Sequence, residues 1–73
     1  MTTTISRVPV DSSSLASVGY SPENSVLEAE FRHGVAYRFF LVPQRVFDDL
    51  LRAESKGTYF NRFIRGRYTH ARL

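Results

Sequence analysis

Hydrophobic and polar positions alternate in three consecutive segments of the chain, residues 15–20, 25–31 and 35–42. A period of two is typical of strands that bury one face and expose the other. The positions assigned to the buried faces are Ala16, Val18 and Tyr20, then Leu27, Ala29 and Phe31, then Val35, Tyr37, Phe39 and Leu41. Turn residues separate the segments, with Pro22 and Asn24 in the first turn and Gly34 in the second. Two tight turns in succession predict an antiparallel meander.

The period of the pattern changes after Pro43, a residue that favours the start of a helix. The apolar positions Val46, Phe47, Leu50 and Leu51 then form one stripe. We expect this helix to end at Gly57, with the glycine in a left-handed conformation. Thr58 is expected to cap a second, short helix. Its apolar stripe consists of Tyr59, Phe60, Phe63 and Ile64, and Gly66 ends it.

Three strands and two helices that each have one apolar face predict a two-layer α+β domain. The expected order is βββαα, a three-stranded antiparallel meander followed by two short helices packed on one face of the sheet. We expect residues 1–11 to form a flexible tail, residues 12–68 a single domain, and residues 69–73 a basic C-terminal tail. No apolar run suits a signal peptide or a membrane span, which favours a cytoplasmic protein.

Composition removes several kinds of chemistry from consideration. A chain of 73 residues can form one domain with a small core. It contains no cysteine, so it has no disulfide, zinc–thiolate site or cysteine nucleophile. His33 is expected in a turn and His70 in a tail, which predicts two separate surface histidines. Glu28 and Glu30 share the outer face of one strand and could pair with Arg38 across the sheet. We therefore expect no enzyme activity, no cofactor and no metal site.

The positive charge is concentrated at one end of the chain. Residues 1–55 contain five arginines and seven acids, a net charge of −2, whereas residues 56–73 contain five cations and no acid. Such asymmetry favours a polyanionic partner. Nine of the ten cations are arginine, which binds phosphate bidentately and stacks on bases. An arginine-rich composition can equally reflect a GC-rich genome, so this bias alone decides nothing.

Two groups of residues are candidates for nucleic-acid contact. Arg38 and Phe40 lie on the outer face of the third expected strand, where an aromatic ring beside an arginine could stack on a base. The second group lies in and after the second helix and consists of Lys56, Arg62, Arg65, Arg67 and Tyr68. The alternative interpretations are packing for the aromatic side chains and a solvated helix face for the cations. An eight-residue helix whose apolar side is needed in the core is a poor membrane anchor.

Several short motifs resemble the KTSC domain, which occurs at the C-terminus of some lysyl-tRNA synthetases and as a stand-alone bacterial protein. The resemblance covers residues 12–68 and depends on three motifs: Gly19-Tyr20, Tyr37-Arg38-Phe39 and the run from Ala53 to Asn61. The family's central Tyr-x-Tyr motif has Phe39 in place of its second tyrosine. The resemblance implies RNA or tRNA binding as the suggested role of the domain.

The leading hypothesis is therefore a small non-catalytic module that binds nucleic acid, RNA or tRNA above all, through its basic C-terminal helix and tail. The alternative is a module for protein–protein interaction or self-association, because a three-stranded sheet leaves open edges and one open face. Neither hypothesis involves a membrane or a metal.

Overall fold

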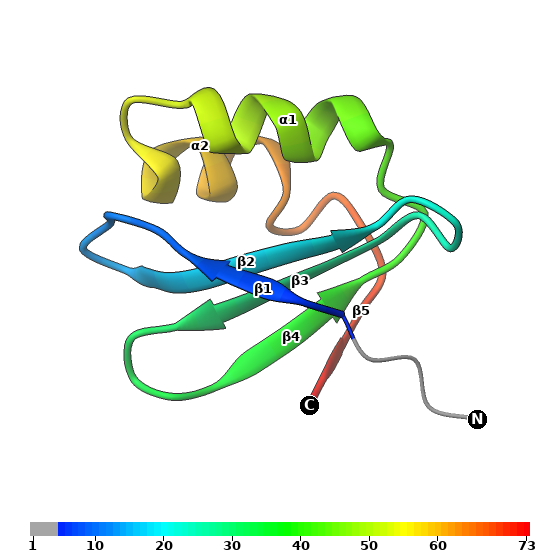
Figure 1. Ribbon diagram of the computed structural model, residues 1–73, viewed down its shortest axis with the longest axis horizontal. Helices are drawn as coiled ribbons and strands as arrows, with labels where there is room; N and C mark the ends of the chain where they lie inside the picture. The colour runs from blue at the N-terminus through cyan, green and yellow to red at the C-terminus, as the bar shows by residue number, and fades with distance from the viewer. Residues whose placement is uncertain (1–4) are drawn as a thin grey trace.

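The computed structural model describes residues 5–73 and shows one antiparallel sheet with two helices on one of its faces (Figure 1). The strands lie side by side in the order β1-β2-β3-β4-β5. The helices are inserted between β4 and β5, so the C-terminal strand returns to pair with β4. The elements are β1 (Arg7–Pro9), β2 (Leu15–Ser21), β3 (Val26–Phe31), β4 (Ala36–Phe39), α1 (Gln44–Arg52), α2 (Lys56–Phe63) and β5 (His70–Arg72).

The α+β class, the antiparallel sheet and the two helices are confirmed, but the prediction of three strands is wrong. The two additional strands, β1 and β5, lie in the segments expected as tails. Each has three residues, and all of them are exposed. A short exposed strand has no buried face and therefore leaves no alternating pattern in the sequence. The first four residues of the expected N-terminal tail lie outside the described residues.

A β-bulge changes which residues of β2 reach the core. The pairing with β3 shifts between Leu15 and Ser17, which leaves Ala16 as the extra residue. Leu15 and Val18 are consequently both fully buried, although strict alternation would place them on opposite faces. The prediction of Ala16 on the buried face in place of Leu15 is wrong for this reason.

The third expected strand is shorter than its pattern indicates. β4 ends at Phe39, and Leu41 has a positive φ of 57° and an exposed fraction of 82%. A left-handed conformation is rare for a branched side chain and breaks the alternation two residues before Pro43. Leu41 therefore points into solvent instead of the core. Val42 takes its place as a fully buried residue.

The junction between the helices also differs from the expectation. α2 begins at Lys56, and Ser55 is its cap, because the Ser55 side chain accepts a hydrogen bond from the Thr58 backbone N–H at 3.3 Å. Gly57 therefore lies inside α2 and does not end α1 in a left-handed conformation. A Cβ atom at Gly57 would lie 2.6 Å from Ser14 Oγ, so this glycine permits the close approach of α2 to the β1–β2 loop.

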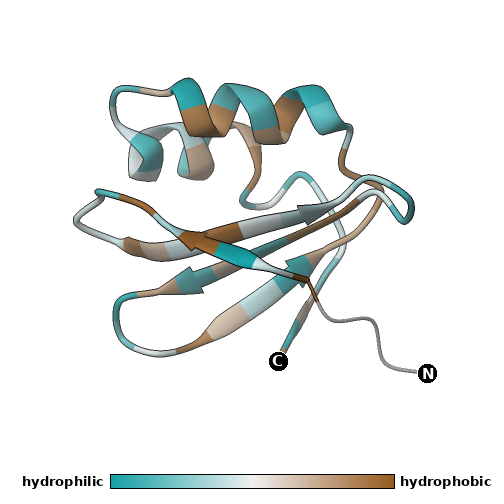
Figure 2. Ribbon diagram, in the orientation of Figure 1, coloured by the Kyte–Doolittle hydropathy of each residue, from teal (hydrophilic) through white to brown (hydrophobic). Residues whose placement is uncertain are grey.

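The core lies between the sheet and the two helices. In Figure 2 hydrophobic and hydrophilic positions alternate along α1, as expected for a helix with one face on the sheet. The Tyr20 ring stacks on Phe47 of α1 at 5.3 Å, and its hydroxyl donates to the Val42 carbonyl. The fully buried members of the core are Leu15, Val18, Leu27, Ala29, Val42, Leu50, Phe60 and Ile64. Within residues 5–73, neither helix has the length and apolar character needed to cross a membrane.

Candidate functional site

A groove of about 440 Å³ opens between α2, the sheet and two loops. The β1–β2 loop, the β3–β4 turn and α2 lie at the same end of the molecule (Figure 1). The groove is lined by Ser13, Ser14, Phe31, Arg32, His33, Tyr37, Phe39, Phe60, Asn61, Arg65, Gly66 and His70. Its volume falls in the range of about 300–1,000 Å³ that is usual for small-molecule sites.

Aromatic rings form the wall of this groove. Phe31 contacts Tyr37 and Phe60 edge-to-face, with ring centroids 5.9 and 5.4 Å apart. Phe39 contacts Phe60 at 5.3 Å, and His70 contacts both Phe39 and Tyr37, at 5.4 and 5.8 Å. These contacts close a ring of five side chains, which holds the wall in one shape. Phe39 and Phe60 are buried, whereas Tyr37 is half-buried and His70 is exposed at the rim.

The polar residues of the groove are basic or neutral. Arg32, His33, Arg65 and His70 are exposed at its rim, and none of the twelve lining residues is acidic. Asn61 is also exposed there and supplies an amide that can donate and accept hydrogen bonds. Arg32 is anchored to the β1–β2 loop, because its Nε donates to the Ser12 carbonyl at 2.5 Å. The groove therefore combines an aromatic wall with positive charge.

The prediction of two unconnected histidines is wrong. His33 in the β3–β4 turn is stacked on Phe31 at a centroid distance of 5.7 Å and lines the same groove as His70. His70 reaches the groove because β5 pairs with β4 and places it opposite Phe39. The two residues are far apart in the sequence, and β5 gave no strand pattern. Only the sheet pairing brings the two histidines to one site.

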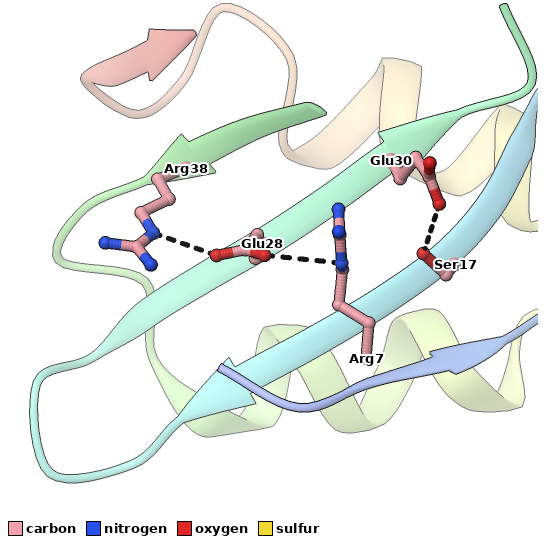
Figure 3. A network of polar contacts seen from close by, with 5 residues as sticks. All are labelled: Arg7, Ser17, Glu28, Glu30 and Arg38. Carbon is pink, nitrogen blue, oxygen red and sulfur yellow. Dashed lines mark hydrogen bonds and ion pairs between the residues drawn. The ribbon is translucent and has the colours of Figure 1, made fainter. Parts of the chain in front are cut away.

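The outer face of the sheet, opposite the helices, carries a network of ion pairs (Figure 3). Glu28 is 4% exposed and lies between Arg38, at 2.8 Å, and Arg7, at 3.3 Å. The predicted pairing of Arg38 with Glu28 is confirmed, while Glu30 instead accepts a hydrogen bond from Ser17. Because side chains alternate along β4, Arg38 lies on the other face of the sheet from its neighbours in the groove wall.

The other predicted contact residues are dispersed over the surface. Phe40 follows β4 and is 36% exposed. Lys56 begins α2 and donates to the Ala53 carbonyl at 3.0 Å, while Arg62 is exposed in the last turn of α2. Arg67 and Tyr68 line a second groove of about 410 Å³.

This second groove also contains Tyr59. Burial, together with the negative charge of Asp49, raises the pKa of the Tyr59 hydroxyl. The lining of this groove includes the carboxylate of Asp49 as well as Arg45 and Arg67, whereas the first groove contains no acidic residue, so the second is less suited to an anion.

Of the seven predicted residues, Arg65 alone lies in the first groove. The sequence reasoning missed Arg32, His33, Asn61 and His70 as site residues. Arg32 and His33 were assigned to a turn, and exposed turn residues carry no periodic signal. Within the described range 5–73, no group of three or more histidine, cysteine, aspartate or glutamate residues could hold a metal ion.

The fold and the groove define a small two-layer α+β domain with a concave basic site at one end. The sequence profile of the KTSC domain matches residues 11–68, and the chain belongs to that family. The crystal structure of a KTSC domain protein from Yersinia pestis is similar, with a TM-score of 0.91 and 37% identity, covering 96% of this chain and 99% of that one.

Two further relatives differ in length. An uncharacterized protein of Stutzerimonas stutzeri is 48% identical over 59 residues, which is 81% of this chain and 83% of the relative. A lysine–tRNA ligase of Nostoc sp. is 41% identical over 54 residues, which is 74% of this chain but 10% of the ligase. The domain thus occurs in small proteins and as a minor part of a much larger one.

Proposed function

We propose that this protein is an RNA-binding module and that the first groove is the centre of its RNA-binding surface. The observation that carries the proposal is the set of basic groups around an aromatic wall, Arg32, His33, Arg65 and His70, with no acidic residue among the lining side chains. RNA supplies phosphates for arginine and unpaired bases for aromatic rings. A protein surface selected only for solubility would mix both signs of charge.

The charge of the C-terminal part supports the same conclusion. Residues 56–73 contain Lys56, Arg62, Arg65, Arg67 and Arg72 and no acid. Arg62 lies in the last turn of α2, close in sequence to the groove residue Arg65. Positive charge beside the groove would attract the RNA backbone and increase the rate of association. The match to part of a lysine–tRNA ligase supports tRNA as the first RNA to test.

Titration of labelled tRNA at low and moderate salt tests this proposal. The double variant Arg32→Ala/Arg65→Ala should bind at least about tenfold more weakly, because charge-assisted hydrogen bonds to phosphate are among the strongest polar contacts. The matched control is Arg45→Ala/Arg52→Ala, which removes two exposed arginines from α1 and leaves the same net charge. Absence of binding at low salt, or equal loss in the two double variants, would contradict the proposal.

A further inference from the structure

The first groove has a buried aromatic end, a feature that contact with the RNA backbone alone does not require. Exposed cations on a convex or flat surface are sufficient for contact with phosphates. Here the cations instead surround a concave site whose buried end is made of Phe39 and Phe60. Such a site favours a ligand with a flat apolar part and a negative charge at one end. A double helix has its bases stacked inside and cannot insert one into a closed end.

We infer that the groove binds a single unpaired nucleotide, with its base against the aromatic wall and its phosphate at the arginines. This inference rests on the proposed function and names the part of RNA that enters the site. Tyr37, His33 and His70 offer ring surface at the rim, since they are not fully buried. Base–aromatic stacking on such rings contributes substantially to single-strand binding and does not depend strongly on the base.

The two arginines of the groove come from different segments of the chain. Arg32 belongs to the β3–β4 turn, and Arg65 to the loop that follows α2. The Arg32 backbone N–H donates to the Ser14 carbonyl at 2.9 Å, and the Arg65 backbone N–H donates to the Phe60 carbonyl at 2.9 Å. Both main-chain positions are therefore fixed by hydrogen bonds to neighbouring elements. Because the main chain at both arginines is already ordered, a phosphate would be bound there without ordering a loop first.

Neutral groups complete the site for a base. Asn61 lies on α2 and can pair with the polar edge of a base, because its amide both donates and accepts. Gly66 has a positive φ of 76°, and no atom lies within 4 Å of the position that a Cβ would take. Gly66 also lines the groove and has no side chain that would narrow it. This leaves room for the sugar that joins base and phosphate.

NMR titration of the full chain locates the ligand. The probes are adenosine 5′-monophosphate, adenosine, inorganic phosphate, a single-stranded RNA pentamer and a blunt-ended RNA duplex of two complementary strands, which has no unpaired nucleotide. The pentamer and the monophosphate should shift the amides of residues 31–39, 60–66 and 70. Adenosine and inorganic phosphate should each bind at least about tenfold more weakly, because each lacks one half of the ligand. The blunt duplex should leave these amides unchanged.

Variants separate stacking from charge in this experiment. His70→Ala and Arg65→Ala should each weaken pentamer binding about tenfold, whereas Arg52→Ala, which removes an exposed arginine of α1, should change it less than twofold at moderate salt. Shifts that map to the outer face around Arg38, or pentamer binding unchanged in both His70→Ala and Arg65→Ala, would overturn the inference.

The outcomes also distinguish this inference from the proposed function. If tRNA binds and the groove amides do not shift, the inference is wrong and RNA binding stands. If the monophosphate binds in the groove and neither tRNA nor the pentamer binds, the groove takes a free nucleotide and the RNA-binding proposal is wrong. If the blunt duplex shifts the groove amides as strongly as the pentamer does, an unpaired nucleotide is not what the groove selects.

Discussion

Glu28 is the residue whose environment differs most from that of an ordinary surface acid. Its carboxylate is buried on the outer face of the sheet and paired with two arginines, at 2.8 Å from Arg38 and 3.3 Å from Arg7. A buried charge that loses its partner is costly, because water cannot replace the lost contact. The network therefore gives Arg38 a structural role that is separate from any contact with RNA.

Arg38→Ala is expected to lower the free energy of unfolding by about 1–3 kcal/mol, because it removes a charged hydrogen bond from the buried Glu28. Urea unfolding followed by circular dichroism measures this change. The surface pair of Arg52 with Asp49, at 3.2 Å, is the comparison, and Arg52→Ala should change stability by less than about 0.5 kcal/mol. Because Arg38 lies opposite the groove, its variant should bind tRNA within twofold of the native chain. A large loss of affinity with no loss of stability would reverse this assignment.

The alternation of apolar and charged residues along the sequence predicted part of the ion-pair network around Glu28. The alternation of Leu27, Ala29 and Phe31 with two glutamates placed Glu28 on the outer face, and Arg38 followed from the next strand. Arg7 could not be predicted, because it reaches Glu28 only through the pairing of β1 with β2. The alternation also could not predict Ser17 as the hydrogen-bond partner of Glu30, because the bulge at Ala16 sets the position of Ser17.

The N-terminal segment is held to the sheet by close approach as well as by pairing. Residues 5–7 pass over Gly19, where a Cβ atom would lie 2.3 Å from the Ser6 carbonyl oxygen and 3.0 Å from the Ile5 side chain. Ile5 is 8% exposed, although all three residues of the strand that follows it are exposed. Gly19 is therefore the residue that permits β1 to lie against β2.

Gly19→Ala is expected to destabilise the protein by about 1–3 kcal/mol, because the added methyl group collides with backbone that cannot move without displacing β1. Thermal or urea unfolding gives the value. In a chain without residues 1–6 the Ser6 and Ile5 contacts no longer exist and only the flexible Arg7 side chain, 3.1 Å from that Cβ, stays close, so the same substitution should destabilise the shortened chain less than the full one. Equal effects in the full and shortened chains would show that the close approach does not matter.

The strands and helices that bury one face were the ones that the sequence pattern predicted. The strands β2, β3 and β4 and the helix α1 each bury one side, and each left a periodic pattern in the sequence. All residues of β1 and β5 are exposed, and neither strand left such a pattern. The misassigned start of α2 has another cause, because Ser55 and Thr58 are both good caps and Gly57 is a common helix terminator. The contact of Gly57 with Ser14, a tertiary feature, decides between them.

The groove belongs to the whole molecule, since its walls come from the β1–β2 loop, the end of β3, the β3–β4 turn, β4, α2 with the loop after it, and β5. Sequence analysis found the acid-free C-terminal segment, because net charge can be counted without a fold. It could not find which cations line one groove. The structure places Arg65 and Arg32 in the lining of the first groove and leaves Lys56 and Arg67 elsewhere.

This distribution of charge predicts the salt dependence of RNA binding. If Arg32, Arg65 and the neighbouring Arg62 make the phosphate contacts, about three phosphates are neutralised, and the logarithm of affinity should fall against the logarithm of salt concentration with a slope of about −2 to −3. If the five cations of residues 56–73 all contacted phosphate, the slope would be about −4. Fluorescence polarisation with labelled tRNA over a salt series measures the slope. Arg32→Ala/Arg65→Ala should reduce the slope to about −1, whereas Arg45→Ala/Arg52→Ala should leave the slope unchanged. A slope that stays near −4 in the groove variant would assign the RNA contact to the dispersed cations instead.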